Sequence, residues 1–223
     1  MSNATLIIGP SGSGKSTSMR NLDPTTTFVL GVLDKPLPFR GYKKHYIPMK
    51  GWDDKAGNYY SSDDWIKLVK CIHVINDSRP EIKTLCLDDM QYLMANEFLR
   101  RATETGFSKF TELAQHLVAV INALTSTRDD LLCFVMCHNE VDMNGRSKCK
   151  TIGKLLDEKI TLEGLFTTIF HSMVVDGQFK FLTQNDGTHI AKSPMGLCAD
   201  LLIDNDLDVI RKAMINYYNE DGE

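Results

Sequence analysis

Short apolar runs alternate with longer amphipathic segments along much of the chain. Runs of roughly four to eight apolar residues, bounded by glycine, proline or charged residues, are typical of buried strands. Apolar residues repeated at helical spacing predict helices that pack one face on a sheet. Strands are therefore predicted at residues 5–8, 27–33, 82–87 and 131–137, and helices at 15–21, 65–75, 90–101 and 107–124.

The last part of the chain has a different pattern. Asp176-Gly177 separates two further apolar runs, and this dipeptide is a strong hairpin signal. Strands that alternate with helices and then a hairpin predict an α/β fold with a mostly parallel sheet flanked by helices. We expect one domain over residues 1–223, with an insertion at about 39–60, a basic loop at about 144–154, a hairpin at about 167–184 and a terminal helix at 206–219.

Composition agrees with a soluble globular domain, since 43% of the residues are hydrophobic and 24% are charged. The 25 basic and 29 acidic residues give a net charge of −4, which argues against a protein that coats nucleic acid by net charge alone but leaves room for a local basic patch. No apolar run approaches the roughly 20 residues of a membrane helix, and the N-terminus lacks the features of a signal peptide.

Six cysteines are present, several of them within the apolar runs. Reduced cysteine behaves there as a small hydrophobic residue, and no second closely spaced pair is present beside Cys133 and Cys137 to complete a zinc site. We therefore expect free, buried thiols and a protein of the reducing cytoplasm.

A phosphate-binding motif lies at the N-terminus, where residues 9–16 read Gly-Pro-Ser-Gly-Ser-Gly-Lys-Ser and match G-x-x-x-x-G-K-[ST]. Glycines let the backbone curl so that its N–H groups face phosphate oxygens, while Lys15 reaches the β- and γ-phosphates and the Ser16 hydroxyl ligates Mg²⁺. The alternative is a chance glycine-rich turn, but a strand precedes the motif and a helix follows it. The sequence thus predicts an ATP and Mg²⁺ site formed by Gly9, Pro10, Ser11, Gly12, Ser13, Gly14, Lys15, Ser16 and Thr17.

Polar residues end two of the other predicted strands. The strand at 82–87 is followed by Asp88-Asp89, a Walker B pattern in which Asp88 holds Mg²⁺ through water and Asp89 orients or deprotonates the attacking water. A helix cap is the other interpretation of Asp89, because a helix begins just after it. His138 follows the fourth strand, where a polar side chain can sense the γ-phosphate, since ligands bind at the carboxyl ends of parallel strands. A surface histidine is the alternative.

These residues resemble the motifs of RecA-like P-loop ATPases in their order: phosphate loop, crossover with a long insertion, Walker B strand, helices, strand with a polar sensor, and late hairpin. The early phosphate loop, Leu87-Asp88-Asp89 and the segment that contains Phe181-Leu182-Thr183-Gln184 and Ala191-Lys192-Ser193-Pro194 further resemble the RecA-core single-strand-annealing and recombination ATP-binding proteins of tailed phages.

The resemblance implies two further catalytic residues. A catalytic carboxylate is expected on the strand next to Walker B; the usual glutamate is absent there, and Asp34 is the nearest acid. Lys192 is expected to be a cation that a neighbouring subunit supplies to the transferred phosphate, which implies a homo-oligomer with ATP sites between its subunits.

A basic segment after the sensor strand lies where the resemblance places a DNA-contacting loop. It contains Arg146, Lys148, Lys150 and Lys154 and no acid, and such a patch can neutralise several phosphates, although it can also be a solvated loop. We therefore expect a Mg²⁺-dependent ATPase that acts on single-stranded DNA in recombination, annealing or replication, with a single-strand-binding or replication protein as partner and, if phage-encoded, the host cytoplasm as its location.

Two other functions are compatible with the same phosphate loop. One is a nucleotide or small-molecule kinase, but such kinases close an arginine-rich lid over the phosphates, and the only adjacent arginines here are Arg100-Arg101. The other is a nucleotide-dependent switch or assembly module with slow turnover.

Overall fold

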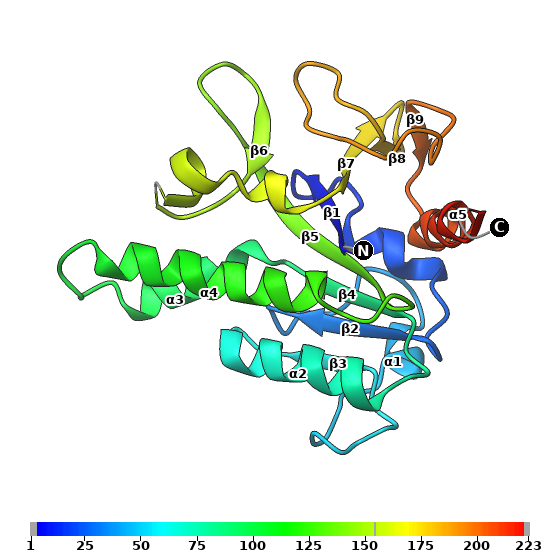
Figure 1. Ribbon diagram of the computed structural model, residues 1–223, viewed down its shortest axis with the longest axis horizontal. Helices are drawn as coiled ribbons and strands as arrows, with labels where there is room; N and C mark the ends of the chain where they lie inside the picture. Colours follow the sequence, from blue (N-terminus) through cyan, green and yellow to red (C-terminus); the bar gives the residue numbers. More distant parts are fainter. Residues whose placement is uncertain (1–3, 154, 221–223) are drawn as a thin grey trace.

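Strand β1 (Ala4–Gly9), which leads into the phosphate-binding motif, lies in the interior of a nine-stranded sheet in the computed structural model (Figure 1). The structure describes residues 4–153 and 155–220. The strand order is β3-β2-β4-β5-β1-β7-β8-β9, and β6 pairs with β5 outside this path. The parallel strands besides β1 are β2 (Thr27–Gly31), β3 (Tyr59–Ser61), β4 (Thr84–Asp88), β5 (Leu132–Val141) and β7 (Thr168–Val175). The antiparallel strands are β6 (Ser147–Cys149), β8 (Gln178–Leu182) and β9 (Leu202–Asp204).

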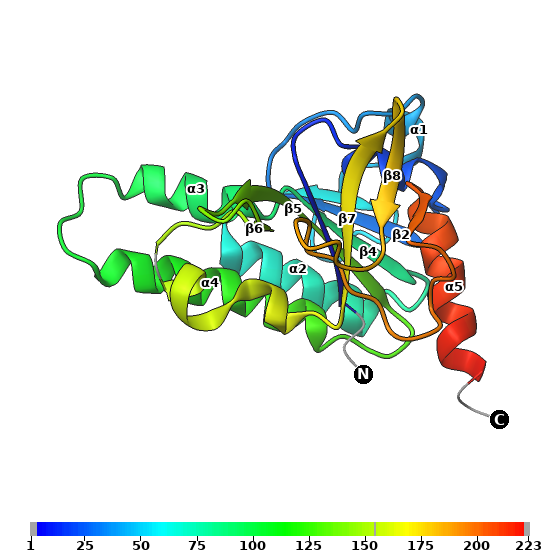
Figure 2. The same cartoon turned by 90° about the horizontal axis from the view of Figure 1, so that it is seen from above.

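Helices cover both faces of this sheet, as the sequence predicted. Successive side chains of a strand point to opposite faces, so Leu6 and Ile8 of β1 enter one core while Ile7 enters the other. Three helices pack over the first core: α2 (Trp65–Ser78), α3 (Gln91–Arg100) and α4 (Ser108–Thr125). The second core is covered by a 3₁₀ helix (Ser16–Asn21), the segment around α1 (Tyr42–His45) and α5 (Leu207–Glu220), which Figure 2 shows on the side opposite α2 and α4.

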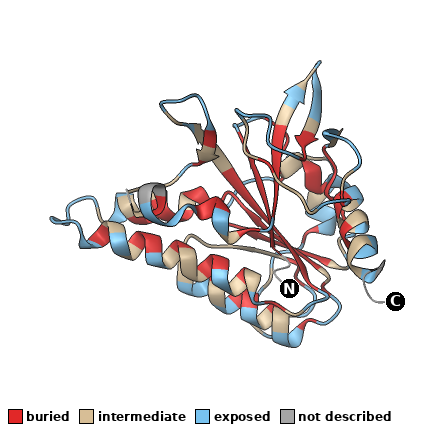
Figure 3. Ribbon diagram, turned by 45° about the horizontal axis from the view of Figure 1, so that its top comes forward, coloured by how far each residue is buried: buried red, intermediate tan, exposed pale blue. Residues whose placement is uncertain are grey.

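Burial follows this layered arrangement. Figure 3 shows the strands almost wholly buried, and the helices buried mainly along the faces that they turn to the sheet. The predicted apolar face of α2 is confirmed, because Leu68, Ile72 and Ile75 are buried in the core. Its start is set by Asp64, whose carboxylate accepts hydrogen bonds from the backbone N–H groups of Ile66 (3.0 Å) and Lys67 (3.5 Å) and so satisfies two free donors of the first turn.

The predicted hairpin is also present. Strands β7 and β8 pair through a turn at Asp176-Gly177, whose φ values of 50° and 74° are both positive. A two-residue turn with both φ values positive matches the right-handed twist of the strands that it joins. Asp tolerates this backbone region better than most residues, which explains why this dipeptide was informative.

The insertion at 39–60 and the basic segment contain more regular structure than expected. The insertion holds the short helix α1 and ends in β3, which pairs in parallel with the outer side of β2. In the basic segment, β5 continues to Val141 and pairs with β6, so the first part of the predicted loop is the turn and the returning strand of an antiparallel hairpin. Both β3 and β6 have 3 residues, too few to produce a recognisable alternation of apolar and polar positions.

The remaining differences are small. The helix after the phosphate loop is a 3₁₀ helix of 6 residues, so little helix dipole points at the loop. Three short elements were not predicted: β9, the π-helical segment Leu155–Ile160 and the 3₁₀ helix Leu162–Leu165.

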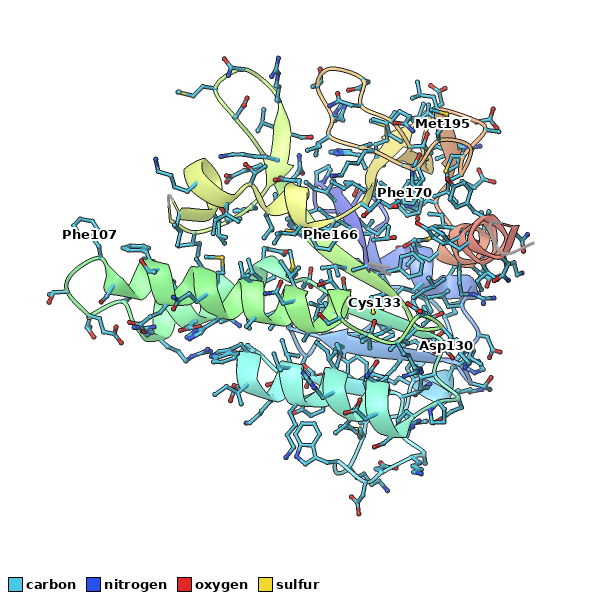
Figure 4. All side chains as sticks on the ribbon, in the orientation of Figure 1. Phe107, Asp130, Cys133, Phe166, Phe170 and Met195 are labelled. Atoms are coloured by element: carbon cyan, nitrogen blue, oxygen red, sulfur yellow. The ribbon has the colours of Figure 1, made fainter. Side chains whose placement is uncertain are left out.

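The six cysteines are free thiols, as predicted, and five of them are buried. Cys133, labelled in Figure 4, lies in the interior strand β5. Among the helices of residues 4–153 and 155–220, none combines the length and the apolar character that a bilayer crossing requires.

Candidate functional site

The polar residues predicted from three separate motifs meet at the carboxyl edge of the sheet. Strand β5 lies between β1 and β4, and His138 on β5 is in register with Gly9, the first residue of the phosphate loop. On the other side of β5, the strand β4 ends at Asp88. Because all three strands are parallel, their carboxyl ends lie together, which is where α/β sheets bind ligands.

The phosphate loop has the backbone conformation that its glycines allow. Gly12 and Gly14 have φ values of 77° and 100°, a region that other residues rarely adopt. A Cβ on Gly14 would lie 2.8 Å from the ring of Phe179, and one on Gly9 would collide with the carbonyl oxygen of Ser172. The glycines are therefore needed both for the curl of the loop and for its close packing against the β7–β8 hairpin (residues 168–182).

Lys15 is folded over the loop. Its Nζ donates hydrogen bonds to the carbonyl oxygens of Gly9 (2.7 Å) and Pro10 (2.8 Å), and the residue is 5% exposed. Burial lowers the Lys15 pKa to about 8, although the negative charges of Asp89 and Asp88 oppose this shift. The ammonium group is therefore still mainly protonated at neutral pH, and a phosphate oxygen in the loop would offer it a charged partner in place of two carbonyls.

Ser16 and Asp88 bring the two predicted halves of the metal site together. The Ser16 hydroxyl donates a hydrogen bond of 2.9 Å to Oδ1 of Asp88, although the two residues are far apart in the sequence. Asp88 is 3% exposed, and burial together with the negative charge of Asp89 raises its pKa to about 6, while Ser16, Lys35 and Lys15 oppose the rise.

This pair fits Mg²⁺. Hydroxyl and carboxylate oxygens are the hard ligands that Mg²⁺ prefers, and a buried carboxylate with a raised pKa gains from a nearby cation. In the part of the chain that the structure describes, no group of three or more His, Cys, Asp or Glu side chains forms a dedicated metal site. That is expected for Mg²⁺ bound with a nucleotide, because it takes one or two protein ligands and completes its shell with phosphate and water.

Asp89 lies beside this pair in an unusual conformation. Its φ is 63°, and its side chain is 2% exposed. The carboxylate forms an ion pair with Lys35, and its Oδ1 lies 3.6 Å from Nε2 of His138. It is therefore directed toward Lys35 and His138 rather than into the first turn of α3, which disfavours the helix-cap interpretation.

His138 completes the cluster as a neutral side chain. Burial lowers the pKa of His138, and the nearby positive charge of Lys15 adds to the effect, whereas Asp89 opposes it. Its backbone is held on both sides: the N–H donates to the side-chain oxygen of Gln91 (3.0 Å), and the carbonyl accepts from the N–H of Lys150 (2.9 Å). The predicted sensor residue thus lies in a fixed position between the phosphate loop and Asp89.

Lys35 is the site residue that the sequence did not reveal. It directly follows Asp34 after β2, and nothing in the local pattern distinguishes it from a surface lysine. Although burial opposes the shift, the hydrogen bond with Asp89 raises the Lys35 pKa. Asp34 is exposed and lines a pocket with Tyr42 and Tyr59 that Lys35 also lines, and it is Lys35 rather than Asp34 that pairs with Asp89.

Lys192 also lies away from the cluster of its own chain. Its backbone N–H and carbonyl pair with Ile169 of β7 at 2.9 Å and 2.7 Å. Ile169 is in register with Leu6, well before Gly9 along β1. Lys192 therefore runs along the side of β7 below the carboxyl edge.

The basic segment forms part of the β5–β6 hairpin (residues 132–149) rather than an open loop. Arg146 is exposed in its turn, and Lys150 is exposed just after β6. Lys148 on β6 forms an ion pair of 3.2 Å with Glu140 on β5, so part of the predicted positive charge is offset. Lys154 lies outside the described residues.

No protein-family model matches the chain, and no curated protein is significantly similar to it in sequence. The function is therefore argued from the geometry of this cluster.

Proposed function

We propose that this protein is a Mg²⁺-dependent ATPase of the RecA-like P-loop type that acts on single-stranded DNA. One observation carries the proposal: the hydroxyl of Ser16 in the phosphate loop is hydrogen-bonded to Asp88 at the end of the acidic strand. A glycine-rich turn that arose by chance has no reason to meet a buried carboxylate at the end of another strand. An ATP site needs both groups at one place, because they bind the same metal ion.

The roles of the residues follow from their positions. The backbone of residues 9–17 and the ammonium group of Lys15 bind the phosphates, and Ser16 with Asp88 holds Mg²⁺. The metal ion would neutralise charge that develops on the phosphate oxygens. Asp89, which is buried beside this pair and held charged by its ion pair with Lys35, orients the attacking water.

The arrangement of the strands supports the RecA-like assignment. The strand with His138 lies between the phosphate-loop strand and the acidic strand, so the neutral imidazole is placed between the two motifs. A neutral histidine can donate a hydrogen bond to the terminal phosphate without adding a full charge. The late β7–β8 hairpin packs directly on Gly14, so the loop is supported from its outer side.

A kinase finds less support. Arg100 pairs with Asp63 at 2.5 Å, and Arg101 pairs with Glu97, Glu104 and Glu112, so the adjacent arginines are held in surface ion pairs around α3 and α4. Figure 4 shows Phe107 at the tip of the connection between these helices, on the far left of the molecule. Both arginines therefore lie in a network of their own rather than in a lid over the phosphate loop.

The test is steady-state ATP turnover with and without Mg²⁺ and single-stranded DNA. We expect hydrolysis that requires Mg²⁺ and increases with DNA. Transfer of the phosphate to an added nucleoside would instead identify a kinase, and slow turnover that DNA does not change would identify a switch. Failure of the folded protein to bind ATP would overturn the assignment of the site.

A further inference from the structure

A second pocket adjoins the phosphate loop on the side away from Asp88. Its volume is about 470 Å³, within the range of small-molecule binding sites. Pro10–Ser13 of the phosphate loop form one wall, the β5–β6 hairpin forms the second and β7 forms the third. Figures 1 and 3 show both hairpins projecting on the same side of the molecule, beyond the helical layers.

The pocket contains an unused hydrogen-bond acceptor. His171 of β7 lines it and is 1% exposed. The imidazole bonds to the backbone of Ile190 and packs against the ring of His189, with 4.7 Å between the ring centroids. Within the described residues its buried Nδ1 has no hydrogen-bond partner, and a ligand reaches this nitrogen only when a covering side chain such as His189 moves. Burial and the neighbouring His189 lower the His171 pKa to about 4, so the ring is neutral at physiological pH. A neutral histidine with one donor already used offers its other nitrogen as an acceptor.

Part of the pocket wall is apolar and exposed, although Asn139, Ser147, Thr188 and His189 also line it. Val141 on β5 is 63% exposed and Val174 on β7 is 52% exposed, and both line the pocket from opposite hairpins. Met143 at the turn of the β5–β6 hairpin is fully exposed. Apolar side chains that remain exposed around one pocket indicate a ligand with an apolar surface.

Together these features select a flat ligand with apolar faces and an uncharged N–H donor at its edge, which describes a nucleobase. We propose that the pocket between the two hairpins binds a base of single-stranded nucleic acid, with a base N–H donated to Nδ1 of His171. The proposal rests on the proposed function and deepens it, because it states how the nucleic acid is recognised.

A polymer suits the pocket better than a free nucleoside. The exposed valines and Met143 continue the apolar surface past the rim, so a chain can pass between the hairpins while one base enters. Arg146 and Lys150, both exposed, offer cations for its phosphates. Because Glu140 and Asp142 on the same hairpin offset part of this charge, contacts with the base must carry much of the affinity.

The pocket also offers a direct route from nucleic acid to ATP. The pocket wall and the phosphate loop share four residues, Pro10–Ser13. The β7–β8 hairpin contacts this segment directly, because the Ser172 hydroxyl donates a hydrogen bond of 2.7 Å to the carbonyl oxygen of Ser13. A base that fills the pocket therefore contacts the segment that holds the phosphates. Stimulation of hydrolysis by DNA would follow from this shared wall.

The test compares two DNA probes of equal length and charge, a fluorescent single-stranded oligonucleotide and an abasic version, by anisotropy without ATP. We expect the abasic probe to bind about tenfold more weakly or worse. Val174→Asp should weaken binding of the normal oligonucleotide to a similar degree. Val209→Asp on α5 is the matched control, since Val209 is 53% exposed and the added charge is the same.

His171→Phe, which keeps a ring and removes the acceptor, should weaken binding in the same assay, and thermal unfolding shows whether it is folded. If it does not fold, the exposed Val174→Asp variant still decides. Equal affinity for the two probes, or equal affinity of the Val174→Asp and Val209→Asp variants, would overturn the proposal. Binding of a free nucleoside that Val174→Asp abolishes, without binding of the oligonucleotide, would also overturn it and identify a small-molecule site.

Failure of this proposal is distinguishable from failure of the proposed ATPase activity because the binding assay contains no ATP. A protein that hydrolyses ATP but binds both probes equally keeps its catalytic assignment and loses the base pocket. A protein that binds the base-containing probe through Val174 but does not hydrolyse ATP keeps the pocket and loses the ATPase assignment.

Discussion

The phosphate loop and the β5–β6 hairpin lie side by side, but the sequence describes them with very different success. In the loop, the residues that must cooperate lie within residues 9–16, so their spacing alone indicates the chemistry. In the hairpin, four cations in one segment suggested a basic patch, yet Lys148 faces Glu140 across the strands. The function of a local motif can be predicted from residues that are close in the sequence. The net charge of a surface depends also on which strands pair, and that pairing cannot be predicted from neighbouring residues.

If this contrast is correct, the largest effect should follow from changing the loop itself. Lys15→Ala should reduce ATP binding and turnover about 100-fold or more, because it removes the cation preorganised for the phosphates. Turnover under saturating Mg²⁺ and binding of a fluorescent ATP analogue measure the effect.

The control for this variant is Lys44→Ala, which removes one exposed lysine outside the loop and should behave as wild type. Unfolding by denaturant should show that both variants fold, with Lys15→Ala the less stable by about 1–3 kcal/mol, since the carbonyls of Gly9 and Pro10 lose their donor. Normal turnover in a folded Lys15→Ala protein would remove the basis for the nucleotide site.

The next effect concerns the residue that joins the loop to the acidic strand. Asp88→Asn should reduce Mg²⁺-dependent turnover by about ten- to a hundredfold, because the amide keeps the shape of the side chain but loses the charge that attracts the metal. A titration of turnover against Mg²⁺ should show a higher requirement. An unchanged Mg²⁺ requirement would show that Asp88 does not bind the metal ion.

Asp88 also predicts how stability depends on pH. Its pKa is raised to about 6 in the folded protein by burial and by Asp89, so between pH 4 and 6 the folded state binds more protons than the unfolded state. The stability of the nucleotide-free protein should therefore fall as pH rises through this window, by on the order of 2 kcal/mol from this group. Denaturant unfolding should show this slope for the wild type and a flatter one for Asp88→Asn; equal slopes would contradict the assignment.

Variants of Lys35 test a residue of the candidate site that no local sequence pattern indicated. Lys35→Met should reduce turnover about tenfold while ATP affinity changes little, because the buried Asp89 carboxylate loses its counter-charge. Lys35→Arg, which keeps a cation, should retain more activity than Lys35→Met. Asp34→Asn is the matched neighbour, and it should be nearly neutral because Asp34 is exposed and Lys35, not Asp34, pairs with Asp89. A selective loss of turnover in Asp34→Asn would restore it as the catalytic carboxylate.

The difference between local motifs and long-range strand pairing also explains how much of the fold could be predicted from the sequence. The α/β class, the mostly parallel sheet, α2 to α5 and the β7–β8 hairpin were predicted because each has a pattern longer than a few residues. The short strands β3 and β6 were missed, because such strands are stabilised by pairing with a neighbour rather than by their own sequence.

Within the candidate site, Lys15, Ser16 and Asp88 were predicted from their motifs, but Lys35, and His171 of the adjoining pocket, were not. Lys35 reaches Asp89 because β2 and β4 are neighbours, and His171 lines its pocket because β7 pairs with β1. Neither pairing can be read from residues close in the sequence. Long-range strand order therefore decides which isolated polar residues join a site.

The smallest expected effect tests the hairpin charge directly. Glu140→Gln removes the acid opposite Lys148 and should increase affinity for single-stranded DNA about two- to threefold, because more positive charge then faces the phosphates. The dependence of affinity on salt should become slightly steeper, since more counterions are released on binding. Glu112→Gln is the matched control: it also removes an acid from a surface ion pair, at 2.7 Å from Arg101, but at the α3–α4 end of the molecule. If both variants gain affinity equally, the effect comes from net charge rather than from the hairpin. If Glu140→Gln has no effect while Arg146→Ala and Lys150→Ala are also neutral, DNA does not contact the β5–β6 hairpin through its cations.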